Sequence, residues 1–157
     1  MGFKKHLRTV QTIIFTLIVV IFFPVILRIL TDYQAGQVFH FGFENPILVI
    51  AIIFFIVLIP IANRIFNVQM SGEFHTANQI FGKYTSALAV KGATLGAAGL
   101  FNSIIYLLTS NFAVLVISIF SIILLVRTFP TQKGVMRNCG ISEQDLENPK
   151  RNFYDDN

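Results

Sequence analysis

Three long stretches without a charged residue constrain this chain more than any other feature. Two of them hold 19 residues each, between Arg8 and Arg28 and between Glu44 and Arg64. The third holds 35 residues, at positions 92–126. A helix needs roughly 20 mostly apolar residues to cross about 30 Å of hydrocarbon. The sequence therefore predicts an all-α integral membrane protein.

The third stretch is too long for one crossing. Its one polar cluster that resembles a turn is Thr109-Ser110-Asn111, and Pro130 ends the apolar run that follows. We therefore expect a four-helix transmembrane domain over 1–130 and a short cytoplasmic tail over 131–157. The four predicted spans are about 10–30, 46–66, 84–108 and 112–129.

Lys and Arg near the span ends predict the orientation. Lys4, Lys5 and Arg8 precede the first span, whereas the loop at 31–45 has neither Lys nor Arg. The loop at 67–83 and the tail carry further basic residues. The sequence therefore places the N-terminus and the C-terminus in the cytoplasm.

The loops and tail carry weaker patterns. Aromatic residues alternate through Phe39–Phe43 and predict an extended segment at the interface, with a partner surface as the alternative. The segment 71–82 predicts a short helix on the membrane, capped by Ser71 and Gly82. Thr131 and Gly140 predict the two ends of a short helical turn in the tail.

Small residues concentrate in the third span and predict that it is the central packing helix. The pattern includes a GxxxG motif, and the candidate packing residues are Ala89, Gly92, Ala93, Gly96 and Gly99. In lipid, helices associate through close packing, so small residues indicate where backbones approach. We expect this face to meet the fourth span, with another chain as the alternative.

Two polar residues of the third span are candidates for function. Lys91 is the one charge well inside a span, and its side chain is either snorkelling to the cytoplasmic headgroups, which we expect, or acting as an intramembrane charge. No Asp or Glu falls within a predicted span to pair with it. Asn102 is expected to form a hydrogen bond across helices.

Basic and aromatic residues at the span ends predict interfacial anchors. Arg28, Arg64 and Arg127 lie at the C-terminal ends of their spans, where positive charge suits the helix dipole. Tyr84 lies at the predicted start of the third span, where an aromatic belt forms. Asp32, four residues after Arg28, is a candidate partner for it.

The segments Lys83–Leu88, Tyr106–Asn111 and Arg127–Thr131 resemble a family of small four-span inner-membrane proteins of Bacteroidetes bacteria. The resemblance covers the last two spans and the start of the tail, and it implies a bacterial inner (cytoplasmic) membrane but no activity. In the family, an acidic residue follows the basic residue of the third span a few positions later. Gly96 stands at that position here, so the resemblance implies no ion pair for Lys91.

The residue content of the chain argues against an enzyme active site. Only 13% of the residues are charged, against about 25% in soluble domains, and the one cysteine, Cys139, excludes a disulfide scaffold. The spans hold no His pair, carboxylate pair or Ser/His arrangement. We therefore expect no enzyme activity, cofactor, metal or nucleic-acid partner. The leading hypothesis is an accessory or scaffold subunit that binds a membrane protein or itself; the alternative is a transporter or channel component using Lys91.

Overall fold

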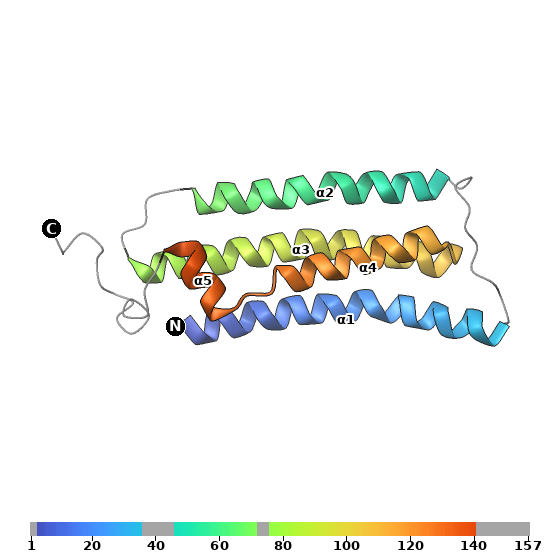
Figure 1. Cartoon of the computed structure of the whole chain (residues 1–157), viewed down its shortest axis with the longest axis horizontal. Helices are drawn as coiled ribbons and strands as arrows, with labels where there is room; N and C mark the ends of the chain where they lie inside the picture. Colours follow the sequence, from blue (N-terminus) through green and yellow to red (C-terminus); the bar gives the residue numbers. More distant parts are fainter. Residues whose placement is uncertain (1–2, 36–45, 72–75, 141–157) are drawn as a thin grey trace.

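The computed structural model describes residues 3–35, 46–71 and 76–140, and these residues form α-helices joined by short links (Figure 1). The all-helical class predicted from the sequence is confirmed for this part of the chain. The aromatic segment 39–43 lies outside the described residues. The helices are α1 (Phe3–Ala35), α2 (Pro46–Met70), α3 (Ala77–Thr109), α4 (Phe112–Arg127) and α5 (Gln132–Cys139).

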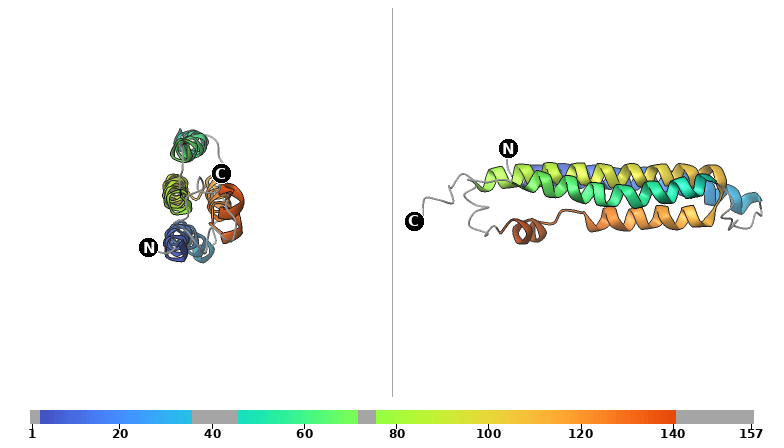
Figure 2. Two further views of the ribbon diagram at one scale, coloured as in Figure 1. Left: turned by 90° about the vertical axis from the view of Figure 1, so that its left-hand side faces the viewer. Right: turned by 90° about the horizontal axis from the view of Figure 1, so that it is seen from above.

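The helix α3 lies at the centre of the bundle. Figure 2 shows α1, α3 and α2 side by side in one layer, with α4 against one side of that layer. The helix α3 packs extensively on α1, α2 and α4, whereas α4 contacts α1 and α2 far less. We call the end of the bundle at which α1 begins and α4 ends the basal end, and the opposite end the distal end (Figure 1).

Three of the described helices, α1, α2 and α3, are long and apolar enough to cross a membrane. The helix α4 is apolar but has only 16 residues. Large apolar side chains also cover much of the outer surface, among them Phe15, Phe23 and Ile56, which are 62%, 68% and 60% exposed. An apolar exterior of this extent is typical of a protein whose surface contacts lipid or other proteins.

The glycines of α3 allow α1 to approach closely. A Cβ atom at Gly96 would lie 2.9 Å from two carbons of Leu17, and one at Gly99 would lie 2.7 Å from Ile21 Cδ1. Only Gly99 also meets α4, where Ser121 Cβ would lie 3.0 Å away. The expectation that the small face meets the fourth span was therefore wrong in its main partner, because the glycines turn mainly toward α1.

The start of α3 also differs from the sequence-based expectation. The helix begins at Ala77, seven residues before the predicted span, and its cap is Thr76, whose hydroxyl accepts a hydrogen bond from the Gln79 N–H. It continues through Gly82, so the separate short helix ending there was wrong. Burial of Ile80 and Phe81 in the core offsets the low helix propensity of the adjacent Gly82.

Capping residues fix the two links that follow. Ser110 adopts a left-handed conformation (φ 51°), and its N–H donates to Tyr106 O at 2.9 Å, while Asn111 Oδ1 accepts from Ala113 N at 2.9 Å. The helix α5 starts at the cap Thr131 and ends at Gly140, which has a φ of 64°. The turn at 109–111 and the helix between Thr131 and Gly140 both lie where the sequence predicts them.

Enlarging Gly99 tests the packing of α3. We expect Gly99→Leu to lower the free energy of unfolding by about 1–3 kcal/mol, because the added side chain overpacks the contact with Ile21 and Ser121. The matched control is Ala97→Leu, which adds a leucine to the same helix at an exposed position. Thermal unfolding in detergent measures both variants, and equal Tm values would contradict this packing.

Candidate functional site

A cavity of about 280 Å³ lies at the basal end, and three cationic side chains line it. They are Lys91 of α3, Arg127 at the end of α4 and Arg137 of α5. Since α4 ends before the other helices do, α5 and the link to it occupy the space beside α3 at this end (Figure 2). We call this space the cationic cavity; its lining also includes Phe66, Tyr84, Thr131 and Asn138.

Three contacts hold the wall of the cationic cavity in place. Val135 of α5 is fully buried in the main core cluster. Gln11 Nε2 of α1 donates a hydrogen bond to Pro130 O at 2.9 Å, and Asn138 Nδ2 donates to the Tyr84 hydroxyl at 3.2 Å. The tail helix is therefore docked on the bundle, and the link before it is tied to α1.

The charged side chains in the described lining of the cationic cavity are all positive. Its described lining contains no Asp or Glu. Lys91 is partly buried, and its Nζ lies 5.2 Å from the centroid of the Phe66 ring, within the range of a cation–π contact. Arg127 and Arg137 are exposed. The structure thus groups the lysine that the sequence singled out with two arginines instead of leaving it alone on α3.

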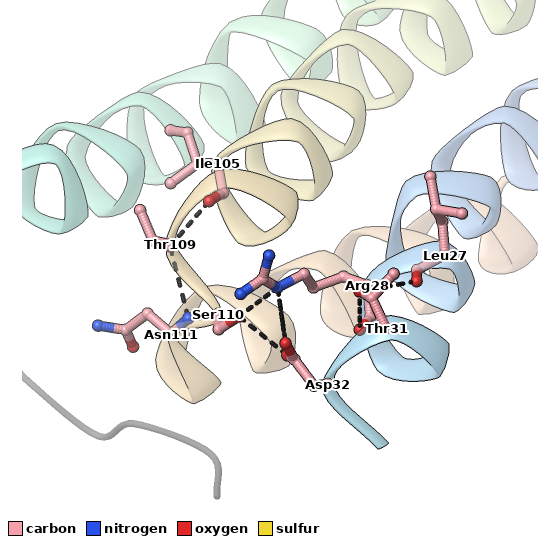
Figure 3. A network of polar contacts seen from close by, with 8 residues as sticks. All are labelled: Leu27, Arg28, Thr31, Asp32, Ile105, Thr109, Ser110 and Asn111. Carbon is pink, nitrogen blue, oxygen red and sulfur yellow. Dashed lines mark hydrogen bonds and ion pairs between the residues drawn. The ribbon is translucent and has the colours of Figure 1, made fainter. Parts of the chain in front are cut away.

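A second polar cluster lies at the distal end, where α1 meets the turn between α3 and α4 (Figure 3). Arg28 Nε lies 3.0 Å from Asp32 Oδ1, and Ser110 Oγ donates to Asp32 Oδ2 at 2.9 Å. Arg28 Nε also donates to Ser110 Oγ. Asp32 is only 6% exposed, so a carboxylate is buried within a helix where none was expected.

The predicted anchors therefore have different surroundings. Arg28 is held in the distal cluster, whereas Arg64 and Arg127 are exposed, as an anchor would be. Tyr84 is only 5% exposed, and its ring packs edge-on against Phe66 at 5.8 Å. The prediction of Tyr84 as a surface anchor was wrong, because α3 extends seven residues beyond it and α5 covers it.

Asn102 does not form the hydrogen bond across helices that the sequence predicts. Its Nδ2 donates to Ala98 O of the same helix at 2.8 Å, and its buried Oδ1 has no partner among the described residues. The buried Tyr106 hydroxyl, one turn further along α3, is likewise without a partner in the described part of the chain. Asn102 does not line the cationic cavity, so it shares no site with Lys91.

The small residues of α3 divide between two faces. Gly92, Gly96 and Gly99 are buried, and Ala89 packs at the edge of the core. Ala93 is exposed, in contrast to the packing role predicted for it. It belongs to a row of exposed positions at helical spacing, which we call the open stripe and which comprises Ser86, Ala93, Ala97, Phe101 and Ile104.

Comparisons with known proteins do not assign this chain to a family. No protein-family model, no curated protein and no solved structure matches the chain. Within the described residues, no group of three or more His, Cys, Asp or Glu side chains is placed to hold a metal ion. The features of this part of the chain that bear on function are the open stripe, the cationic cavity and the distal cluster.

Sequence reasoning missed Arg137 and Asn138 as site residues. Both lie in α5, more than 40 positions from Lys91 along the chain, and only the docking of α5 brings the three together. The caps at Thr131 and Gly140 predicted the helix but not where it packs. The available signal was the apolar side formed by Val135 and Met136 on a short, mostly polar helix, which is typical of a helix that docks by one face.

The distal cluster is expected to stabilise the fold through coupling of its charges. Asp32→Leu should lower the free energy of unfolding by about 1–3 kcal/mol, since it removes the carboxylate that accepts from both Arg28 and Ser110. The double variant Arg28→Leu/Asp32→Leu should cost less than the sum of the two single changes. Chemical unfolding measures this cycle, with Thr31→Val, which alters a hydrogen bond local to α1, as the control. Additive costs would refute the coupling.

Docking of α5 also predicts a poorly reactive thiol. Burial raises the pKa of Cys139 from 9.0 to about 11, so the thiolate is about a hundredfold scarcer at pH 8 than in an exposed thiol. Maleimide labelling of the native protein should therefore be slow at pH 8 and accelerate as the pH rises toward 11. Denatured protein and Val135→Asp, which undocks α5, should label quickly. Native labelling as fast as denatured labelling would contradict the docked arrangement.

Proposed function

We propose that this chain is a membrane-embedded four-helix protein without catalytic activity that serves as a scaffold or accessory subunit. It binds a helix of a membrane partner, or of a second copy, along the open stripe of α3. The observation that carries the proposal is the one-sided bundle, in which α4 packs on one side of the layer formed by α1, α3 and α2 (Figure 2).

The spacing of polar contacts along the bundle supports insertion in a bilayer. Gln11 donates a hydrogen bond to Pro130 O at the basal end, and Asp32 accepts one from Ser110 at the distal end. These two residues of α1 are 21 positions apart, which is about 32 Å at 1.5 Å per residue. Lys91 and Ser110 are about 28 Å apart along α3 by the same measure. Both lengths match a hydrocarbon core of about 30 Å.

The same measure supports α4 as the fourth span. Its 16 residues cover about 24 Å, from the turn at Ser110 to Arg127 in the wall of the cationic cavity. Its ends thus coincide with the two polar levels, and the exposed side chains between them are apolar, including Val116, Ile119 and Ile123. A bilayer accommodates a short span by thinning locally at modest cost.

Charge supports an orientation with the basal end in the cytoplasm. Among the described residues with defined side chains, the basal half holds every Lys and Arg except Arg28, which is paired with Asp32. Positive residues flanking spans are retained on the cytoplasmic side. Both chain termini then lie in the cytoplasm, and the family resemblance favours a bacterial inner membrane.

The open stripe supports helix binding because its central residues are small. Ser86, Ala93 and Ala97 are exposed on α3, while the helices on either side leave this face uncovered. Small residues allow another backbone to approach closely, and close packing is the main attraction between helices in lipid. The alternative of a transporter has less support, since the cationic cavity that Lys91 lines includes neither Asn102 nor a residue of the distal end.

Affinity purification from native membranes in a mild detergent tests the scaffold proposal. The tagged chain should elute with a membrane-protein partner or as an oligomer. Ala93→Trp should reduce the associated material about tenfold or more, because the indole overpacks the helix contact. The control is Phe15→Trp, at an exposed position of α1. A monomer without a partner, or an Ala93→Trp variant that binds normally, would refute the proposal.

A further inference from the structure

We infer that the cationic cavity binds a phosphate-bearing anion through Lys91, Arg127 and Arg137. Three helices bring these cations to one partly open space of about 280 Å³. The inference is independent of the open stripe, so either proposal can fail without the other.

The three cations of the cavity have no anionic partner in its described lining. Like charges held around one space repel each other, and a bound anion removes that repulsion. The described lining offers no carboxylate to do so, and the described residues place their one ion pair at the distal end, between Arg28 and Asp32. The two guanidinium groups are suited to paired hydrogen bonds with phosphate oxygens, and the ammonium group adds a compact charge.

The wall of the cavity also offers hydrogen-bond donors. The Tyr84 hydroxyl accepts from Asn138, and its own proton remains available to donate. Thr131 is in the same position, since its hydroxyl accepts from Gly134 N at 3.1 Å. Thr131 also caps α5, whose N-terminus adds the positive end of a helix dipole to the wall. Cationic side chains and hydroxyl donors around a small volume bind phosphate oxygens.

The size and remaining lining define the ligand further. Ligand pockets usually span about 300–1,000 Å³, so this cavity suits a small anion or a headgroup and excludes a large cofactor. Phe66, Leu88 and Phe129 add apolar surface beside the cations. A mixed lining of this kind suits a phospholipid phosphate with its glycerol, while a free phosphate would use only the polar part.

Two matched pairs of variants separate this cavity from general surface charge. Lys91→Gln is paired with Lys83→Gln on α3, and Arg137→Gln is paired with Lys133→Gln on α5. The two variants of a pair each remove one positive charge from the same helix, but only the first variant of each pair changes a residue that lines the cavity. Lys83, Lys133 and Arg137 are exposed, so their replacement leaves the core intact.

Native mass spectrometry of the delipidated full-length protein in neutral detergent measures binding. The probes are phosphatidylglycerol, phosphatidylcholine and inorganic phosphate. We expect phosphatidylglycerol to bind in preference to phosphatidylcholine, and Lys91→Gln and Arg137→Gln each to weaken it about fivefold, with little change in the two controls. Inorganic phosphate that displaces the lipid at millimolar concentration identifies a free anion as the ligand; phosphate that does not displace it identifies the headgroup.

Either of these results supports the site. Equal binding of the two lipids, or equal losses in Arg137→Gln and Lys133→Gln, would overturn it, because the attraction would then come from diffuse surface charge. Absence of binding by both phosphatidylglycerol and inorganic phosphate would overturn it as well. Unchanged Tm values for Arg137→Gln and Lys133→Gln confirm that the comparison reports binding and not folding.

Discussion

The close packing of α3 on α1 is the contact on which the rest of the structure depends. Gly92, Gly96 and Gly99 lack side chains along one face of α3, and Ile14, Leu17 and Ile21 of α1 occupy that space. Because α1 and α2 make little or no contact with each other, both are held in place through α3. The helix α4 is also attached chiefly to α3, through a short capped turn. The central position of one helix rich in small residues thus produces a layer with one covered side and one open side.

Polar contacts at the two ends fix how the helices are aligned lengthwise. At the distal end, Arg28 and Asp32 connect α1 to Ser110 in the turn between α3 and α4. At the basal end, Gln11 connects α1 to Pro130 in the link after α4. A displacement of α1 by a single turn would break both connections, because a turn moves a residue by about 5.4 Å. The proposed anion site depends on this alignment, since it brings Lys91 level with the end of α4.

Local features of the chain determined its helices. The uncharged stretches indicated where the apolar helices run, although α1 and α3 extend beyond the predicted bounds. The turn at 109–111 and the caps Thr131 and Gly140 could be predicted because capping involves residues only a few positions apart. The start of α3 was harder to predict. Gly82 resembles a helix end in the sequence, and only the burial of the neighbouring Phe81 explains why the helix continues.

Tertiary structure alone decided which faces of these helices meet. Apolar and small residues occur all around α3, so the sequence could not show that its glycines turn toward α1 while Ala93 and Ala97 stay exposed. The burial of Asp32 and the grouping of Lys91 with Arg127 and Arg137 likewise join residues that are distant in the sequence. The position of an apolar helix follows from consecutive residues, whereas a partner face depends on side-chain fit between separate helices. For that reason the apolar helices could be predicted from the sequence and the site could not.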